Sequence, residues 1–216
     1  MNNSVVQAFR NQFLNAFGIQ LPRIVEHVPT EVLTINGEKR IIEELFRLED
    51  DTLLHIEYQA SANSKDLDQL FVDLMWNDLK ICEKHENLIR TIVILGPAIL
   101  DAELSRDLGA IKYKVTEAVW LSRMDGDQIA EEFTKKVGQK GDLTNEELPV
   151  LVMMPFMHTS SRLEIVKKAV QIAYKLADEG KRDLVISSMR AMAERLLSDE
   201  DGSQVVKALS KLNLRE

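Results

Sequence analysis

The chain has 216 residues, of which 45% are hydrophobic and 29% are charged, and its formal net charge is −8 at pH 7. This composition predicts a folded protein with a sizeable core and excludes an intrinsically disordered chain, and the negative charge gives no global field that attracts nucleic acid. One cysteine cannot form an intrachain disulfide. With no basic and apolar leader and no apolar run of about 18 residues, we expect a cytoplasmic protein without a membrane span.

The N-terminal part of the chain predicts one helix followed by antiparallel strands. Apolar residues recur at helical spacing over residues 4–17. Strand candidates at residues 32–35 and 40–48 flank an Asn-Gly pair, which is a strong hairpin-turn signal. A third strand at residues 53–59 follows an acidic turn, so short connections join all three. We therefore expect an antiparallel meander.

The pattern then changes to that of a crossover unit. Apolar residues recur at helical spacing over residues 65–85, and residues 88–95 form a nearly continuous β-branched run, as in a strand buried on both faces. A helix between two strands predicts that residues 88–95 lie parallel to a strand of the meander. A further strand is expected at residues 113–121.

The last 90 or so residues predict helices. The fold class is therefore α/β, with an α/β core at residues 1–122 and a helical C-terminal region at residues 123–216. The helical segments expected in this region are residues 125–137, 160–178 and 183–197, with an ambiguous apolar run at 148–157 and a short terminal piece.

Polar side chains at the end of the third strand are the candidate functional group. Alternate side chains of a strand share a face, so His55, Glu57 and Gln59 point one way, and we expect the apolar residues between them to pack under the helix that follows. The preceding strand carries Glu43 and Glu44, and one of this pair must share the face of Glu57. Carboxylates on adjacent strands can hold a hard divalent cation, although edge-strand carboxylates are more often simply solvated.

The string RIIEELFRLEDDTLLHIEYQAS resembles the core of the PD-(D/E)XK nuclease superfamily, in particular its Rpn branch of recombination-promoting nucleases and putative transposases. In that branch an acidic residue on one strand is followed, after a hairpin, by a strand ending in a Glu-x-Gln motif. The resemblance extends through the following helix to LGPAI, LPVLVMMPFM and MRAMAERLL. It implies a restriction-endonuclease-like mixed sheet flanked by helices, with a helical C-terminal extension. It also implies a DNA endonuclease that uses Mg²⁺ or Mn²⁺.

The resemblance assigns roles to individual residues. Glu57 matches the metal-binding acid and Gln59 the position of the superfamily's lysine. The first metal-binding acid falls on Glu43, or on Glu44 if the hairpin register differs by one. The backbone carbonyl of Tyr58 is expected to ligate the metal as well. A metal-bound water would then attack phosphorus, while Gln59 orients a water or the phosphate.

The chain also departs from the family pattern. Glutamate replaces aspartate at position 43, Gln59 cannot supply a lysine's charge, and no acid precedes Phe9-Arg10 in the first helix. These departures leave open an alternative to the leading hypothesis of an active endonuclease, namely a catalytically degenerate nuclease fold that acts as a DNA- or protein-binding module. A third hypothesis is a structural homo-oligomer built through the helical tail.

Four other features are expected to have ordinary structural roles. His55 is expected to be a solvated cross-strand partner. The acidic run at residues 49–51 is expected to be a hairpin tip, and Asp125-Gly126-Asp127 a turn that caps a helix instead of a calcium loop. The basic residues that flank the acidic strand could contact phosphate, although they are more often solvated. These residues are Lys39, Arg40 and Arg47.

Overall fold

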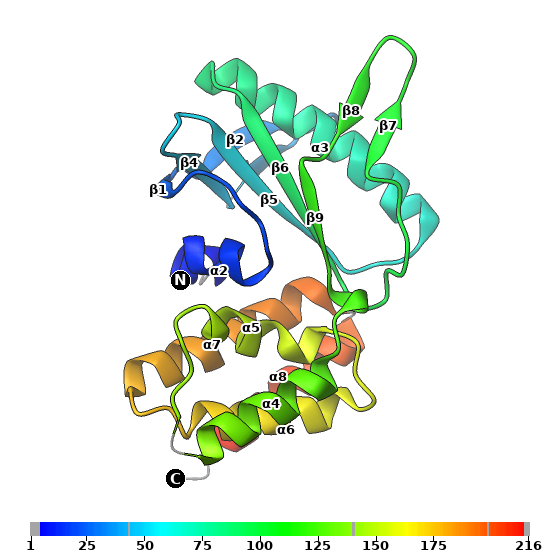
Figure 1. The fold of residues 1–216 in the computed structure, drawn as a ribbon. Helices are drawn as coiled ribbons and strands as arrows, with labels where there is room; N and C mark the ends of the chain where they lie inside the picture. The colour runs from blue at the N-terminus through cyan, green and yellow to red at the C-terminus, as the bar shows by residue number, and fades with distance from the viewer. Residues whose placement is uncertain (1–4, 43, 140, 198, 214–216) are drawn as a thin grey trace.

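The computed structural model describes residues 5–42, 44–139, 141–197 and 199–213, so Glu43 lies outside the described residues. A mixed sheet crosses the upper half of the molecule, and the helix α3 (Ser64–His85) lies across one of its faces (Figure 1). The N-terminal helices and the C-terminal helical region lie against the other face (Figure 1). The α/β class expected from the sequence is confirmed.

The central sheet contains five strands within the described residues. Their order across the sheet is β1 (Ile24–His27), β4 (Leu45–Leu48), β5 (Leu53–Gln59), β6 (Ile89–Leu95) and β9 (Glu117–Trp120). β1, β4 and β5 pair antiparallel, whereas β6 lies parallel to both β5 and β9. The predicted strand at residues 53–59 and the parallel crossover through α3 are confirmed.

Two small hairpins stand apart from this sheet. β2 (Thr30–Leu33) pairs with β3 (Lys39–Ile42), and β7 (Ser105–Asp107) pairs with β8 (Lys112–Lys114). The Asn-Gly hairpin turn is confirmed, with Gly37 at φ +80°.

The sequence predicts one continuous strand at residues 40–48 and another at residues 113–121, and both predictions are wrong. Each segment is divided between a small hairpin and the central sheet: the first into β3 and β4, the second into β8 and β9. In the first, β3 pairs with β2 while β4 joins β5. The meander is consequently β1, β4 and β5, and β1 lies before the first strand candidate of the sequence.

The helix predicted at residues 4–17 is interrupted. It consists of α1 (Val5–Phe9) and α2 (Asn11–Ala16), and Arg10 between them has φ +48°, outside the helical region. The predicted helical C-terminal region is confirmed for the described residues. Its helices are α4 (Gly126–Gly138), α5 (Glu147–Met153), η2 (Met154–Phe156), α6 (Arg162–Ala173), α7 (Glu179–Leu196) and α8 (Asp199–Asn213).

The two faces of β5 pack the opposite way round from the expectation that its apolar residues lie under α3. Leu54 and Ile56 belong to a large core cluster formed with α1, α2 and the C-terminal helices, not with α3. The face that carries His55 and Glu57 is turned toward α3, whose Asp78 contacts His55. The reason is that the largest apolar surface comes from the C-terminal helices, which cover the more apolar face of the strand. One continuous core therefore joins residues 1–122 to residues 123–216.

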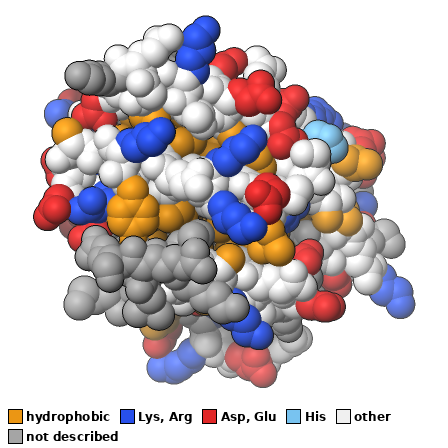
Figure 2. All heavy atoms as spheres, turned by 90° about the horizontal axis from the view of Figure 1, so that it is seen from below, with side chains coloured by type: hydrophobic (Ala, Val, Ile, Leu, Met, Phe, Trp, Pro, Cys, Tyr) orange, Lys and Arg blue, Asp and Glu red, His pale blue; other side chains and the backbone are white. Residues whose placement is uncertain are grey.

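The surface of the C-terminal helices mixes all side-chain types. Figure 2 shows apolar patches on the described part of this face, with lysine or arginine and aspartate or glutamate side chains interspersed among them. Among the described helices, none is long and apolar enough to cross a lipid bilayer.

Candidate functional site

A pocket of about 340 Å³ opens where the chain passes from β3 into β4 and where β5 continues beyond the paired part of β4. It is bounded by both hairpin and sheet residues and by one residue of α7. The residues that line it are Arg40, Ile41, Ile42, Glu44, His55, Ile56, Glu57, Tyr58 and Arg195. The pocket therefore contains two carboxylates, two guanidinium groups and one imidazole.

Glu44 stands immediately before β4 and is held by both its backbone and its side chain. Its carbonyl oxygen accepts a hydrogen bond from the N–H of Ile56 at 2.9 Å, which ties it to β5. Its carboxylate is only 4% exposed and accepts a hydrogen bond from Nη1 of Arg195 at 2.6 Å. The guanidinium of Arg195 also lies over the ring of Tyr58, 5.2 Å from its centroid. A buried carboxylate of this kind requires such a cationic neighbour.

Glu57 lies on β5 where the register pairs it with Val93 of β6. Its Oε2 accepts a hydrogen bond from Nη2 of Arg40 at 3.0 Å, and its side chain is 21% exposed. Arg40 comes from β3, so the β2–β3 hairpin supplies the cation that faces Glu57. The two pocket carboxylates thus each have a different arginine partner.

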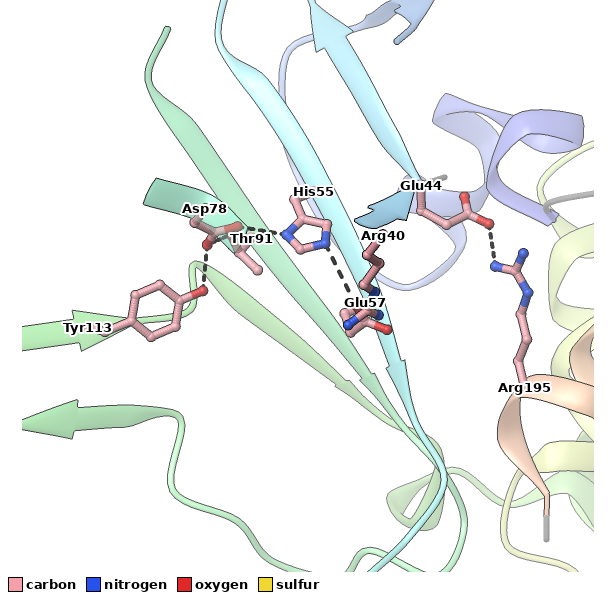
Figure 3. Close-up of polar contacts among 8 residues, drawn as sticks. All are labelled: Arg40, Glu44, His55, Glu57, Asp78, Thr91, Tyr113 and Arg195. Carbon is pink, nitrogen blue, oxygen red and sulfur yellow. Dashed lines mark hydrogen bonds and ion pairs between the residues drawn. The ribbon is translucent and has the colours of Figure 1, made fainter. Parts of the chain in front are cut away.

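His55 is fully buried, so the expectation that it is solvated is wrong. Its Nδ1 lies 2.7 Å from Oδ1 of Asp78, and Oδ2 of Asp78 accepts hydrogen bonds from Thr91 at 2.5 Å and Tyr113 at 2.6 Å. Figure 3 shows His55 between Asp78 and Glu57. Burial and the negative charge of Asp78 raise the pKa of the Tyr113 phenol well above its ordinary value, so this hydroxyl remains a donor.

The backbone of Tyr58 is turned toward the same edge as Glu44. Neighbouring residues of a strand direct their backbone groups to opposite sides. The Ile56 N–H points to Glu44, and the Gln59 carbonyl accepts from the N–H of Gly96 on the other side. The Tyr58 carbonyl is therefore directed to the same edge of β5 as the Ile56 N–H that bonds Glu44, two residues farther along the strand. Burial raises the pKa of the Tyr58 phenol well above its ordinary value, and the negative charge of Glu44 raises it further.

Gln59 lies beside a second pocket, of about 230 Å³, between β5 and α3. Its Nε2 donates to the carbonyl oxygen of Ser61 at 3.0 Å, a contact that fixes the loop before α3. Arg40 and Glu57 line both pockets and so form the wall between them. The structure therefore brings Glu44, Glu57 and the Tyr58 carbonyl to one pocket and places the Gln59 amide in its neighbour.

The ligand atoms of the pocket are of the kind that a hard divalent ion binds, but the side chains that could supply them are few. Two carboxylates and a carbonyl are oxygen ligands that Mg²⁺ accepts alongside several waters. Among the described residues, however, no group of three or more His, Cys, Asp or Glu side chains is arranged to hold a metal ion. A cation at this pocket would use one or two carboxylates and would compete with Arg40 and Arg195 for them.

The other basic residues near the acidic strand are engaged in exposed ion pairs. Lys39 lies 3.0 Å from Glu31, and Arg47 lies 3.3 Å from Glu26. Of the three basic residues expected to flank the site, only Arg40 lines the pocket.

Two residues of the site were missed by sequence reasoning. Arg195 belongs to the quoted MRAMAERLL string, but it reaches Glu44 across 151 positions, and no local pattern indicates such a contact. Asp78 carried a usable signal in the sequence, because it interrupts the apolar stripe of α3, and the structure shows that it is only 4% exposed. A charged residue on the buried side of a helix requires a polar partner on the facing strand.

Comparisons of the chain with protein-family models, curated proteins and solved structures give no match.

Proposed function

We propose that this protein is a metal-dependent nuclease that hydrolyses phosphodiester bonds in DNA, with Glu44 and Glu57 as its metal-binding carboxylates. The observation that carries the proposal is that these two glutamates, from neighbouring antiparallel strands, line one pocket together with two arginines. The resemblance to the Rpn branch of the PD-(D/E)XK nucleases supports it. As part of the same proposal, we infer that the mixed sheet has the restriction-endonuclease-like fold.

Glu44 approaches the pocket from the opposite face of the sheet to Glu57, because the register pairs Leu45 with His55 and the Glu44 carboxylate contacts Arg195 of α7, so a shared ion would lie at the edge of β5. Two features suit Glu44 to the first metal-binding position. It is nearly buried at the start of β4, and its carbonyl is hydrogen-bonded to the strand that carries Glu57. The Tyr58 carbonyl is directed to the same edge. Glu43, the first choice from the sequence, lies outside the described residues. The two glutamates are therefore compared by substitution in the experiment below.

The carboxylates and the guanidinium groups of the pocket would each have a task in phosphodiester hydrolysis. A bound Mg²⁺ or Mn²⁺ would act as a Lewis acid and lower the pKa of a bound water. Glu44 and Glu57 would hold that ion, which would weaken their attraction for Arg195 and Arg40. The guanidinium groups would then be available to a phosphate, whose negative charge they attract in bidentate fashion. In this scheme the arginines supply the positive charge that Gln59 lacks.

A second function, binding without catalysis, is favoured by one specific observation. Each pocket carboxylate already lies within 3.0 Å of an arginine nitrogen. The site is therefore charge-balanced without any metal ion, as in a nuclease fold that has become a DNA- or protein-binding module.

The two functions are separated by incubating supercoiled plasmid with the protein and Mg²⁺ or Mn²⁺. We expect nicking by the wild type and a loss of about 100-fold or more in Glu57→Gln and Glu44→Gln, because glutamine keeps the shape but not the charge of the ligand. Glu43→Gln reports on the alternative ligand, and Glu131→Gln, on the exposed face of α4, is the matched control. Equal nicking by the wild type and Glu57→Gln contradicts the nuclease proposal. A gel shift without nicking supports the binding module.

A further inference from the structure

The most unusual group in the pocket is the second ring nitrogen of His55. The imidazole is fully buried, and its Nε2 has no hydrogen-bond partner among the described residues. A buried polar atom without a partner costs free energy, so native proteins usually give such an atom a ligand, a water or another polar group. His55 is one of the residues that line the pocket, as is Glu57, whose Oε2 lies 3.8 Å from Nε2.

The hydrogen bonds of Asp78 determine which nitrogen of His55 carries the proton. Asp78 accepts from the hydroxyl groups of Thr91 and Tyr113, and an ionised carboxylate has no proton to donate. The contact at 2.7 Å between Asp78 and Nδ1 therefore requires that Nδ1 carries a hydrogen. In the neutral ring this leaves the lone pair of Nε2 facing Glu57.

The distance between Nε2 and Glu57 fits a shared cation better than a direct hydrogen bond. Nε2 lies 3.8 Å from Oε2 of Glu57, beyond hydrogen-bond range. Zinc bonds to imidazole nitrogen and carboxylate oxygen are each about 2.1 Å long, and a tetrahedral angle places two such ligand atoms about 3.4 Å apart. A movement of about 0.4 Å would bring the two groups to that separation, well within what a side chain can make.

The surroundings of His55 are those of a metal-ligating histidine. Such residues almost always donate their other ring N–H to a carboxylate, which fixes the ring and makes the ligating nitrogen more basic. Asp78 occupies that position and is itself held by two hydroxyl groups (Figure 3). The competing cation, Arg40, has a side chain that is 41% exposed and can swing into solvent.

We propose that His55 and Glu57 form a binding site for a divalent transition-metal ion such as Zn²⁺, with Asp78 as the outer carboxylate that orients His55. An imidazole ligand selects ions such as zinc over magnesium, which prefers oxygen ligands. The inference deepens the proposed function, since it rests on Glu57 as a metal ligand, and it changes the preferred ion from Mg²⁺ to one that binds imidazole.

The test is a calorimetric titration of the full chain with Zn²⁺ and, separately, with Mg²⁺. His55→Asn retains an N–H donor for Asp78 but removes Nε2, so we expect its Zn²⁺ affinity to fall by at least about tenfold while its Mg²⁺ affinity changes little. Asp78→Asn is expected to weaken Zn²⁺ binding by about 10- to 100-fold. His85→Asn is the matched control. His85 lies on α3, as Asp78 does, but its ring is hydrogen-bonded to Thr30, so this variant should bind Zn²⁺ like the wild type.

Two results overturn the inference. One is an unchanged Zn²⁺ affinity in His55→Asn. The other is an equal loss for both ions, which shows that His55 only positions Glu57. If His55→Asn does not fold, the ring nitrogens of the wild type are followed by NMR. Zn²⁺ must then change the chemical shift of the Nε2 resonance of His55, and an unchanged Nε2 resonance at saturating Zn²⁺ also refutes the site.

Failure of this inference is distinguishable from failure of the nuclease proposal. Nicking that requires Glu57 without any Zn²⁺ effect at His55 removes only the inference. Zn²⁺ binding that depends on His55 without any nicking removes only the nuclease function.

Discussion

Arg195 of α7 donates a hydrogen bond to Glu44 at the start of β4 across 2.6 Å, and this contact attaches the C-terminal helices to the candidate site. Glu44 is 4% exposed and the side chain of Arg195 is 23% exposed, so water screens the pair only weakly. The helical region is therefore part of the site and not a separate appendage.

Removing the arginine should destabilise the fold. Arg195→Met keeps much of the side-chain volume but takes the guanidinium away from a nearly buried carboxylate, and we expect a loss of about 2 to 4 kcal/mol in the free energy of unfolding. Urea denaturation measures this loss. Arg190→Met, at an exposed position of the same helix, should change it by less than about 0.5 kcal/mol. If Glu44→Gln in the Arg195→Met background restores no stability, the ion pair is not the cause.

A second prediction concerns stability at high pH. Burial raises the pKa of the Tyr113 phenol above its unfolded value of 10.0. Above that pH the unfolded chain loses a proton that the folded chain keeps, so the stability contribution is complete below pH 10 and declines as pH rises, by up to about 1.4 kcal/mol per pH unit. Tyr113→Phe should therefore flatten the decline measured by urea denaturation between pH 9.5 and 11. An unchanged slope means that Tyr113 ionises equally in both states.

The strands that local patterns specify strongly could be predicted from the sequence. Residues 53–59 alternate clearly and follow a turn, and residues 88–95 are a continuous β-branched run, so β5, β6 and their parallel pairing were predictable. The acidic run before β5 is confirmed as a turn, in which Asp50 accepts from the N–H of Thr52.

The sequence predictions that proved wrong concern features that depend on contacts between distant segments. Nothing local marks the break between β3 and β4, because β3 is held by β2 and β4 by β5. The side of the sheet covered by α3 could not be read from β5 alone, because the C-terminal helices provide the larger apolar surface. His55 was judged exposed for the same reason, since its partner Asp78 lies 23 positions away on α3. Local sequence therefore pointed to Glu44 and Glu57 as candidates but not to the residues that contact them.

The acidic pair at the start of α4 gives a third prediction. Asp125 caps α4 by accepting from the N–H of Gln128 at 2.9 Å, and Asp127 accepts from the N–H of Ser160 at 2.6 Å, so helix capping is confirmed. Asp125→Ala should cost about 1 kcal/mol of stability, measured by urea denaturation, with Glu131→Ala as the control on the same helix. Millimolar Ca²⁺ should leave the melting temperature of the wild type unchanged. A clear rise with Ca²⁺ that Asp125→Ala abolishes would mean that the turn is a calcium site.

The competition between Arg40 and a metal ion for Glu57 gives the last prediction. The guanidinium of Arg40 lies 3.0 Å from Oε2 of Glu57, so a cation that binds this carboxylate must first displace it. Arg40→Met removes the competitor, and we expect the affinity for Mn²⁺ measured by calorimetry to rise about three- to tenfold, which corresponds to the strength of a partly exposed ion pair.

The neighbouring residue provides the control for net charge. Lys39→Met also removes one positive charge, but Lys39 pairs with Glu31 on the β2–β3 hairpin and does not line the pocket. Its Mn²⁺ affinity should therefore stay close to that of the wild type. An equal rise in both variants would show that only the overall charge matters. No rise in Arg40→Met would show that Glu57 is not where the ion binds, and Arg40 would then be a structural partner of Glu57 instead of a competitor for it.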